Sequence, residues 1–166
     1  MAFDTFLKLE GVSGETTRKG FENQIEIYSF SFGASNPTTV GSGSTGMSAG
    51  KVSLSSFNIM KKTDVSSPTL FQTCCIGDHF KTAVVTLNKA SGDKTTPLAF
   101  LKYDFEELFI ESIQWSGSAG GDDTPTESVS FSFGKVTITY TPQSTTGGAA
   151  PKPAVASWDV RTAVAT

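Results

Sequence analysis

The sequence has few cysteines, one histidine and no long apolar run. Its two cysteines, Cys74 and Cys75, are neighbours, so they cannot join distant segments in a disulfide framework, and this pattern fits a reducing compartment. No apolar run approaches the ~20 residues that span a bilayer. The first residues, MAFDTFLKLEG, lack the basic and apolar regions of a signal peptide. We therefore expect a protein that is made in the cytoplasm and does not insert into a membrane.

Clustered positive charge is also missing. The formal net charge is -3, the isoelectric point is near 5.1, and no Lys/Arg cluster is larger than Lys61-Lys62. Proteins that bind nucleic acid usually carry a basic patch that neutralises phosphates. We therefore expect no nucleic-acid partner.

Residues that favour strands and turns are abundant. The chain of 166 residues contains 13 Phe and 16 Gly, with many Ser and Thr. Its length suits one domain with its own core, residues 1–166. Strands are predicted at Asp4–Leu9, Gln24–Ala34, Lys51–Lys61, Thr82–Lys89, Leu98–Trp115, Glu127–Tyr140 and Val155–Arg161.

One short helix is predicted at Pro68–Ile76. Ser67 is suited to cap its start, Pro68 to its first turn and Gly77 to its end. Residues four apart lie on the same side of a helix. We expect one buried helix face made of two such pairs, Leu70 with Cys74 and Phe71 with Cys75.

The apolar alternation changes phase inside four long strands. Phe131 and Phe133, for example, give way to Val136 and Ile138 across Gly134. Each change requires a bulge, or a strand that passes from one packed face to another. Long bent strands are typical of small closed barrels. We predict an all-β, mainly antiparallel fold: a small closed β-barrel with one short α-helix and a long extended loop. Apolar positions on both faces also indicate an outer surface covered by another subunit.

The pentapeptide SFSFG occurs at Ser29–Gly33 and again at Ser130–Gly134. The residues that flank it differ between the two sites, so similar packing of the two strands explains the repeated pentapeptide better than duplication does. Both copies place Phe on one face of a strand and Ser on the other. We expect a small, polar, uncharged surface opposite the core, lined by Ser29, Ser31, Ser128, Ser130 and Ser132.

Two glycine-rich stretches match nucleotide-binding motifs only in part. GSGSTG at Gly41–Gly46 fits G-x-G-x-x-G, but a predicted strand follows it where a helix should face the pyrophosphate. AGKVS departs from a phosphate loop, because Thr45 stands at its first glycine and Val52 at its Ser/Thr. We interpret Ser35–Gly50 as a long excursion that contacts another molecule.

The stretch CCIGDH is a weak candidate for a metal site. Adjacent helix positions point about 100° apart, and no second ligand pair exists elsewhere in the sequence. Buried small apolar residues are the better interpretation of Cys74 and Cys75. His79 is the only histidine, and no nucleophile motif accompanies it.

Two carboxylate pairs are also weak candidates for catalysis. Glu106 and Glu107 are strand neighbours that point to opposite faces, and Asp122 and Asp123 lie in a loop, where solvated charge is the ordinary interpretation. We therefore expect no catalytic residue, no cofactor and no metal. These patterns alone leave open a structural subunit and a monomeric β module that binds carbohydrate or protein.

The order of features resembles the haemolysin-coregulated protein (Hcp) family. The similar stretches are MAFDTFLKLEGVSGET, IEIYSFSFG with the arm that follows it, AGKVSLSSFNIMKKTDVSSPTLFQTCCIGDHF, DDTPTESVSFSFGKVTITYTPQ and ASWDVRTAVA. Together they cover essentially residues 1–166. That family forms the inner tube of the bacterial type VI secretion machine. A phage-tail-like tube protein is the alternative with the same physical role.

The resemblance implies assembly and partners. Six copies are expected to close into a ring, and rings to stack into a tube inside a contractile sheath, tipped by a trimeric spike. Effector proteins are expected to be held in the lumen until the tube is ejected. Export by this machine would explain secretion without a signal peptide.

The resemblance also implies roles for individual residues. Ser29 and Ser31 are expected to face the lumen and its effectors, with Phe30 and Phe32 in the core. Asp122 and Asp123 are expected in a loop on a ring face. The loop that reaches other subunits, within Asn36–Gly50, is expected to include Thr38, Thr39, Val40, Gly41, Ser42, Gly43, Ser44, Thr45, Gly46 and Met47.

Overall fold

The computed structural model describes residues 3–40, 47–89, 98–121, 123–145, 149 and 151–166. Within these ranges the elements in chain order are β1 (Asp4–Leu9), β2 (Ile25–Ile27), β3 (Ser29–Ser31), β4 (Ala34–Ser35), β5 (Thr38–Val40), β6 (Met47–Ala49), β7 (Ser53–Leu54), β8 (Phe57–Lys62), α1 (Ser67–Ile76), β9 (His79–Lys89), β10 (Leu98–Ser116), β11 (Thr126–Tyr140), β12 (Ala154–Asp159) and β13 (Val164–Ala165).

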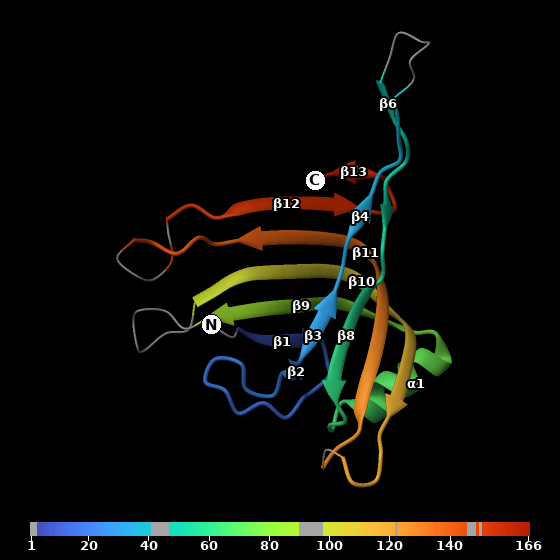
Figure 1. Ribbon diagram of the computed structural model, residues 1–166, viewed down its shortest axis with the longest axis vertical. Coiled ribbons are helices and arrows are strands. Elements are labelled where there is room, and N and C mark those ends of the chain that lie inside the picture. The colour runs from blue at the N-terminus through green and yellow to red at the C-terminus, as the bar shows by residue number, and fades with distance from the viewer. Residues whose placement is uncertain (1–2, 41–46, 90–97, 122, 146–148, 150) are drawn as a thin grey trace.

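Most strands belong to one antiparallel sheet that curls on itself (Figure 1). Its order is β13-β12-β11-β10-β9-β1-β2, and β8 pairs with both β11 and β3. β2 and β3 flank Tyr28, whose N–H donates to the Met60 carbonyl at 2.8 Å. Because β2 pairs with β1 and β3 pairs with β8, the strand pairings lead around the sheet and return to β8. The mainly antiparallel β fold with one short helix is confirmed.

β10 and β11 change their buried face at the same point. In β10 the buried positions pass from Phe105 to Leu108, and β11 makes the same change across Gly134, while the pairing between the strands stays in register. Glu107 has a left-handed φ of 55° at this point. A separate bulge follows a few residues later in β10. The predicted phase changes in these strands are confirmed, and a bend that both strands share produces them.

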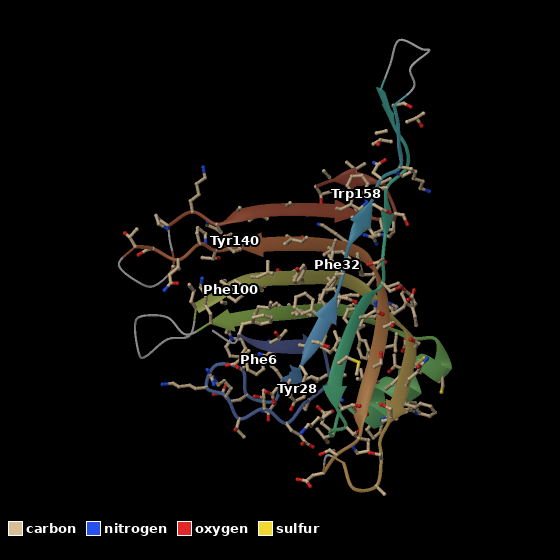
Figure 2. The ribbon with its side chains drawn as sticks, in the orientation of Figure 1. Phe6, Tyr28, Phe32, Phe100, Tyr140 and Trp158 are labelled. Carbon is tan, nitrogen blue, oxygen red and sulfur yellow. The ribbon has the colours of Figure 1, made fainter. Side chains whose placement is uncertain are left out.

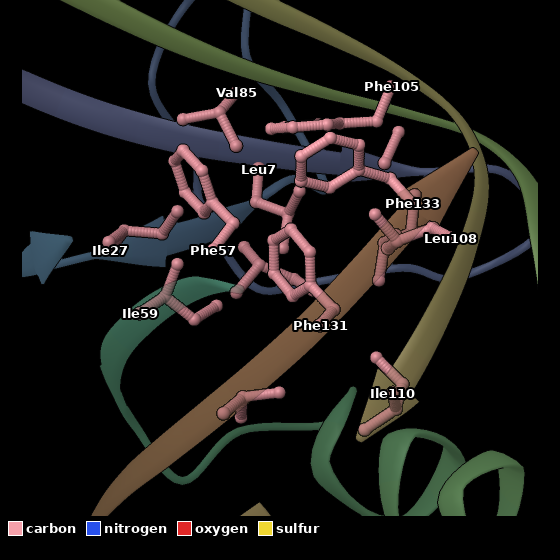
Figure 3. Close-up of a cluster of buried hydrophobic side chains, with 14 of the residues drawn as sticks. Leu7, Ile27, Phe57, Ile59, Val85, Phe105, Leu108, Ile110, Phe131 and Phe133 are labelled. Carbon is pink, nitrogen blue, oxygen red and sulfur yellow. The ribbon is translucent and has the colours of Figure 1, made fainter. Parts of the chain in front are cut away.

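Aromatic side chains fill the core. Phe57 is fully buried and its ring lies 5.1 to 5.6 Å from those of Phe30, Phe105 and Phe131 (Figure 3). Fully burying one such side chain contributes about 1.5–3 kcal/mol. The other members of the buried cluster are Leu7, Leu9, Ile25, Ile27, Ile59, Leu70, Ala83, Val85, Leu87, Leu108, Ile110, Val129, Phe133 and Val136.

α1 packs on the sheet through a narrow stripe of side chains. Leu70 is buried in the core and Cys74 packs against it, as expected. Phe71 and Cys75 are exposed, so the predicted second half of the buried face is wrong. The strands already fill the core, which leaves room for one row of helix side chains.

The helix begins one residue earlier than predicted, at Ser67, and ends at Ile76 as predicted. Ser66, not Ser67, is the N-cap residue, and its side chain makes no capping hydrogen bond. Ser67 is the first helical residue, and its hydroxyl instead accepts a hydrogen bond from Lys61. Gly77 ends the helix with a left-handed φ of 70°, as predicted.

An arm projects from the curled sheet (Figure 1). It consists of two short two-stranded ladders. Within the described residues, β4 pairs only with β7, and β5 pairs only with β6. Phe32 and Trp158 lie at its base (Figure 2), where they help to line an apolar groove with Leu54 and Ile138. The excursion predicted at Ser35–Gly50 is therefore a β-hairpin wherever the structure describes it.

Candidate functional site

The sheet of β3, β8, β11 and β10 carries an uncharged polar surface on the side away from the core. Cross-strand pairing places Ser31, Asn58, Ser130 and Ser112 in one row. A second row contains Ser29, Met60, Ser128 and Gln114. We call these eight residues the polar face.

Alternation along the strands produces this face. Ser29 and Ser31 are exposed, while Phe30 between them stacks on Phe57 with ring centres 5.6 Å apart. Phe32 also packs against Phe57, at 5.6 Å. The predicted surface opposite the core is confirmed for Ser29, Ser31, Ser128 and Ser130. The fifth serine, Ser132, lies at its margin, beside Phe109 of β10.

Asn58 connects the strands of the polar face. Its Nδ2 donates to Ser31 Oγ at 3.4 Å and to the Ser56 carbonyl at 3.3 Å. Its Oδ1 accepts a hydrogen bond from the Ser130 hydroxyl. One amide therefore spans β3, β8 and β11, which fixes how the hydroxyl groups are presented.

The chemistry of the polar face is that of a neutral lining. Seven of its eight side chains carry a hydroxyl or an amide group, Met60 carries a thioether, and none is charged. Two charged residues lie at its margin: Glu111 accepts a hydrogen bond from the Ser56 hydroxyl, and Lys62 continues the outward phase of Asn58 and Met60 on β8. Such a surface exerts no strong field of one sign, so it offers many weak contacts and no strong point of attachment.

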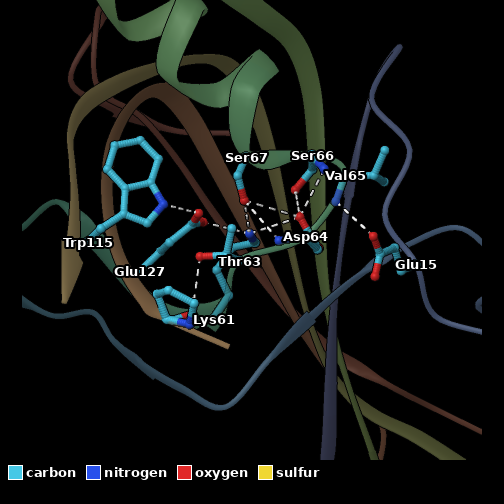
Figure 4. A network of polar contacts seen from close by, with 10 residues as sticks. Glu15, Lys61, Thr63, Asp64, Val65, Ser66, Ser67, Trp115 and Glu127 are labelled. Carbon is cyan, nitrogen blue, oxygen red and sulfur yellow. Dashed lines mark hydrogen bonds and ion pairs between the residues drawn. The ribbon is translucent and has the colours of Figure 1, made fainter. Parts of the chain in front are cut away.

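A buried ion-pair network lies beneath the polar face (Figure 4). Lys61 Nζ is 2.7 Å from Glu127 Oε2, 2.9 Å from Asp64 Oδ1 and 3.0 Å from Ser67 Oγ. Trp115 Nε1 donates to the other oxygen of Glu127. The side chains of Lys61 and Glu127 are fully buried. The network ties β8, β11 and β10 to the start of α1.

Sequence analysis missed this network, although the strand pattern contains a signal for it. Lys61 continues the inward phase of Phe57 and Ile59, and Glu127 precedes the inward Val129 in the same phase. Two opposite charges at inward positions of neighbouring strands indicate a buried pair.

The described part of the arm pairs with itself, and Thr38, Thr39, Ser48 and Ala49 are exposed. Thr38, Thr39 and Val40 of β5 face Ala49, Ser48 and Met47 of β6. Gly41, Ser42, Gly43, Ser44, Thr45 and Gly46 lie outside the described residues. The contact role expected for this loop stays a prediction.

The loop predicted on a ring face connects β10 to β11. Asp123 is exposed there, and Asp122 lies outside the described residues. This connection lies at the end of the molecule opposite to the arm (Figure 1). The two ends therefore carry different chemical surfaces.

The Glu106 and Glu107 carboxylates have different partners. Glu106 lies 3.5 Å from Lys135, whereas Glu107 Oε1 accepts a hydrogen bond from Arg161 at 2.7 Å. Arg161 also contacts Asp159. The Arg161 guanidinium, followed by the Thr162 amide, lowers the pKa of Asp159 to about 2. Glu107, Asp159 and Arg161 thus form a structural clamp at the bend of the sheet.

Among the residues that the structure describes, the remaining metal-site candidates do not gather into one group. His79 Nδ1 lies 3.5 Å from Asp78 and its ring stacks on Phe109 at 5.2 Å. Cys75 is exposed and Cys74 is half-buried, so the prediction of buried cysteines is wrong for Cys75. Among the described residues, no three His, Cys, Asp or Glu side chains gather as metal ligands would. The described helix is too short to cross a membrane.

Comparison with known proteins gives one consistent match. The family model of the type VI secretion system effector Hcp matches residues 6–140. Protein hcp1 of Pseudomonas aeruginosa is 32% identical over 161 residues, covering 97% of each chain. The structure of a type six secretion system protein superposes with a TM-score of 0.92 at 34% identity, over 99% of this chain and 100% of that one. Hcp1 from Salmonella typhimurium superposes with a TM-score of 0.79 at 30% identity, over 100% of both chains.

Proposed function

Because this chain belongs to the Hcp family of type VI secretion proteins, we propose that it is a subunit of a type VI inner tube. Six copies form a ring around a channel, and rings stack into a tube that is ejected. A tube subunit needs surfaces for assembly and a lining, and it needs no catalytic residue. The observation that carries this proposal is the polar face.

The polar face has the properties of a channel lining. It extends across four neighbouring strands, and its two rows alternate with the side chains of the core. With Ser29 and Ser31 facing the channel, the wall is neutral and its hydroxyl groups are held by Asn58. Cargo is then retained by weak contacts and released without breaking strong ones. Effector proteins of the secretion machine are the proposed cargo.

The two ends of the molecule support stacking. The arm lies at one end and the β10–β11 connection with Asp123 at the other (Figure 1). Head-to-tail contacts between different surfaces repeat without closing, and they build an open filament. In the proposed tube the arm, including Thr38, Thr39 and Val40, reaches a neighbouring subunit or ring. The sheath surrounds the tube and the spike covers its tip.

Native mass spectrometry of the purified protein, with negative-stain images of the same sample, tests the assembly. Hexamers with an open centre are the expected result. A stable monomer at high concentration would contradict the proposal and favour a monomeric binding module. Detection in culture medium only when the secretion machine is intact would support the proposed route from the cytoplasm.

Replacing Ser31 by Trp tests the lining. The indole would enlarge an exposed position of the polar face without entering the core, so rings should form while effector retention falls at least several-fold. Ser13→Trp, at an exposed residue outside the polar face, is the control. Pull-down of an effector with each ring preparation measures retention. Equal retention by both variants would overturn the placement of Ser31 in the channel.

A further inference from the structure

We propose that Asn58 is a positioning residue that gives the polar face a hydrogen-bonding direction, so that Ser31 donates to the cargo and Ser130 accepts from it. This inference rests on the proposed channel lining and adds the chemical class of the group that each position takes. Ser31 takes a carbonyl or carboxylate oxygen of an effector protein, and Ser130 takes one of its N–H groups.

The contacts of Asn58 fix which end of its amide faces which strand. The main-chain carbonyl of Ser56 lies 3.3 Å from Asn58 Nδ2. A carbonyl oxygen only accepts hydrogen bonds, so the nitrogen of the amide has to face it. The amide oxygen then faces Ser130, whose hydroxyl donates to it. The orientation of this one amide is therefore determined by its surroundings.

The two serine hydroxyls beside Asn58 are left with opposite capacities. A hydroxyl has one proton to donate and two lone pairs that accept. Ser31 Oγ accepts from Asn58 Nδ2 at 3.4 Å, which leaves its proton for a group in the channel. The Ser130 proton is committed to Asn58 Oδ1, which leaves its oxygen as an acceptor. We call Ser31, Asn58 and Ser130 the directed row.

The neighbouring row of the polar face shows what Asn58 adds. There Ser29 and Ser128 flank Met60 in the same cross-strand arrangement. A thioether has no proton to donate and is only a weak acceptor, so Met60 cannot orient either hydroxyl as an amide does. The face therefore carries one row with a fixed direction beside one without it.

The spacing of the directed row suits an extended segment of polypeptide. β3 and β11 lie on either side of β8. Neighbouring strands are about 4.8 Å apart, so the backbones that carry Ser31 and Ser130 are about 10 Å apart. Three residues of an extended chain cover about the same distance and present both C=O and N–H groups. The main chain of an effector can thus meet both hydroxyls, whereas one small amide molecule cannot.

The test measures how tightly purified rings bind a fluorescently labelled effector protein encoded in the same secretion gene cluster. Asn58→Asp keeps the shape of the side chain but removes both N–H donors, so Ser31 turns its proton toward the carboxylate. Ser130 still donates, because a carboxylate accepts. The substitution should therefore withdraw the free proton of Ser31 and leave the role of Ser130 unchanged.

A double-mutant cycle isolates this effect. In the unmodified protein, Ser31→Ala should raise the dissociation constant about fivefold, which corresponds to the loss of one hydrogen bond worth ~1 kcal/mol. Beside Asn58→Asp, Ser31→Ala should change it by less than about twofold, because the proton is already withdrawn. Ser130→Ala should have a similar effect in both backgrounds. A merely structural role of Asn58 would not abolish the effect at Ser31 and preserve the effect at Ser130.

Gln114→Glu is the matched control for the added charge. Gln114 is an exposed amide on the polar face, outside the directed row. Its replacement adds the same charge, so Ser31→Ala should keep its effect in this background. Circular dichroism and negative-stain images verify that each variant folds and forms rings. If Asn58→Asp does not, Asn58→Leu replaces it and should raise the dissociation constant at least about threefold, because both hydroxyls lose their orientation, while Gln114→Leu should not.

The outcomes separate this inference from the proposed function. An effect of Ser31→Ala that disappears beside Asn58→Asp but not beside Gln114→Glu supports the direction set by Asn58. An effect that persists beside Asn58→Asp, or that disappears equally in the control, overturns the inference and leaves the ring proposal standing. Ser31→Ala rings that bind the effector as tightly as unmodified rings also overturn it. Unmodified protein that forms no rings, or rings that bind no effector, overturn both the inference and the proposed lining.

Discussion

At the scale of single residues, the Lys61–Glu127 pair is the most demanding feature of the fold. Two fully buried charges lie 2.7 Å apart, and Asp64, Ser67 and Trp115 satisfy their remaining hydrogen-bonding groups. Desolvation offsets much of the attraction in such a pair. The network favours one pairing register of β8 against β11, because only that register places Lys61 and Glu127 opposite each other.

Removing Lys61 alone should strongly destabilise the protein. Lys61→Met leaves Glu127 buried without its cation, so the free energy of unfolding should fall by about 3–5 kcal/mol. The double variant Lys61→Met with Glu127→Leu should recover at least half of that loss, since it removes both charges. Urea unfolding at fixed protein concentration measures both values.

The control for this prediction is an ion pair at the surface. Lys102 lies 3.1 Å from Asp104, and both side chains are partly exposed. Lys102→Met should therefore change the free energy of unfolding by less than about 1 kcal/mol. A Lys61→Met variant as stable as Lys102→Met would show that the buried pair does not hold the sheet together.

The residue pattern correctly predicted which strand side chains face the core, but it was less successful in predicting which helix side chains are buried. The alternation around Ser29 and Ser31 correctly separated hydroxyls from Phe30, because a strand has only two faces. Helix spacing did not separate Leu70 from Phe71, because both residues belong to i, i+4 pairs. Which pair is buried depends on the sheet beneath the helix, and sequence spacing alone does not contain that information.

At the scale of elements, strand positions were predicted better than strand continuity. The segment predicted as one strand at Gln24–Ala34 is broken at Tyr28, where it exchanges β1 for β8 as its partner. The next predicted strand, Lys51–Lys61, is likewise divided into β7 and β8. Such breaks result from a change of partner in the folded sheet, and the local residues carry little signal of it.

The turn after β12 should make stability sensitive to acid. The pKa of Asp159 is about 2 in the folded chain, below its ordinary value of 3.8, mainly because Arg161 binds the carboxylate. A lowered pKa contributes stability above the unfolded value, and that stability is lost as the pH falls from about 4 toward 2. Asp159→Asn keeps an oxygen for the Arg161 and Thr162 amides but removes the charge.

Thermal unfolding between pH 4 and pH 2 measures this effect. The melting temperature of Asp159→Asn should fall less steeply over this window than that of the unmodified protein. Asp104→Asn, at a surface pair on β10, provides a comparison and should keep the slope of the unmodified protein. Identical slopes for the Asp159 variant and the unmodified protein would exclude the clamp as a source of acid sensitivity.

At the scale of the whole molecule, the main sheet and the arm are separate structural parts. The main sheet contains most of the buried cluster, whereas β5 and β6 pair only with each other within the described residues. Sequence analysis identified the arm as an excursion, because it is long, rich in glycine and poor in apolar residues. It could not predict the arm's direction, which depends on the short ladder at its base, where Ser55 N–H donates to the Gly33 carbonyl at 2.9 Å.

Shortening the arm should therefore spare the fold and impair assembly. In the variant, residues 37–50 are replaced by a single Gly, so that Asn36, the new Gly, Lys51 and Val52 form a four-residue loop between the paired Ser35 and Ser53. The monomer should keep its circular dichroism spectrum and a melting temperature within a few degrees, because no member of the buried cluster is removed. Stacked tubes should disappear from negative-stain images. If the arm contacts a subunit of the same ring, rings should disappear as well.

The control variant replaces residues 37–50 by an equal number of Gly and Ser residues, which keeps the length of the arm but not its sequence. Tubes in the shortened variant would show that the arm is not an assembly contact, whereas tubes in the control alone would show that reach matters more than side chains.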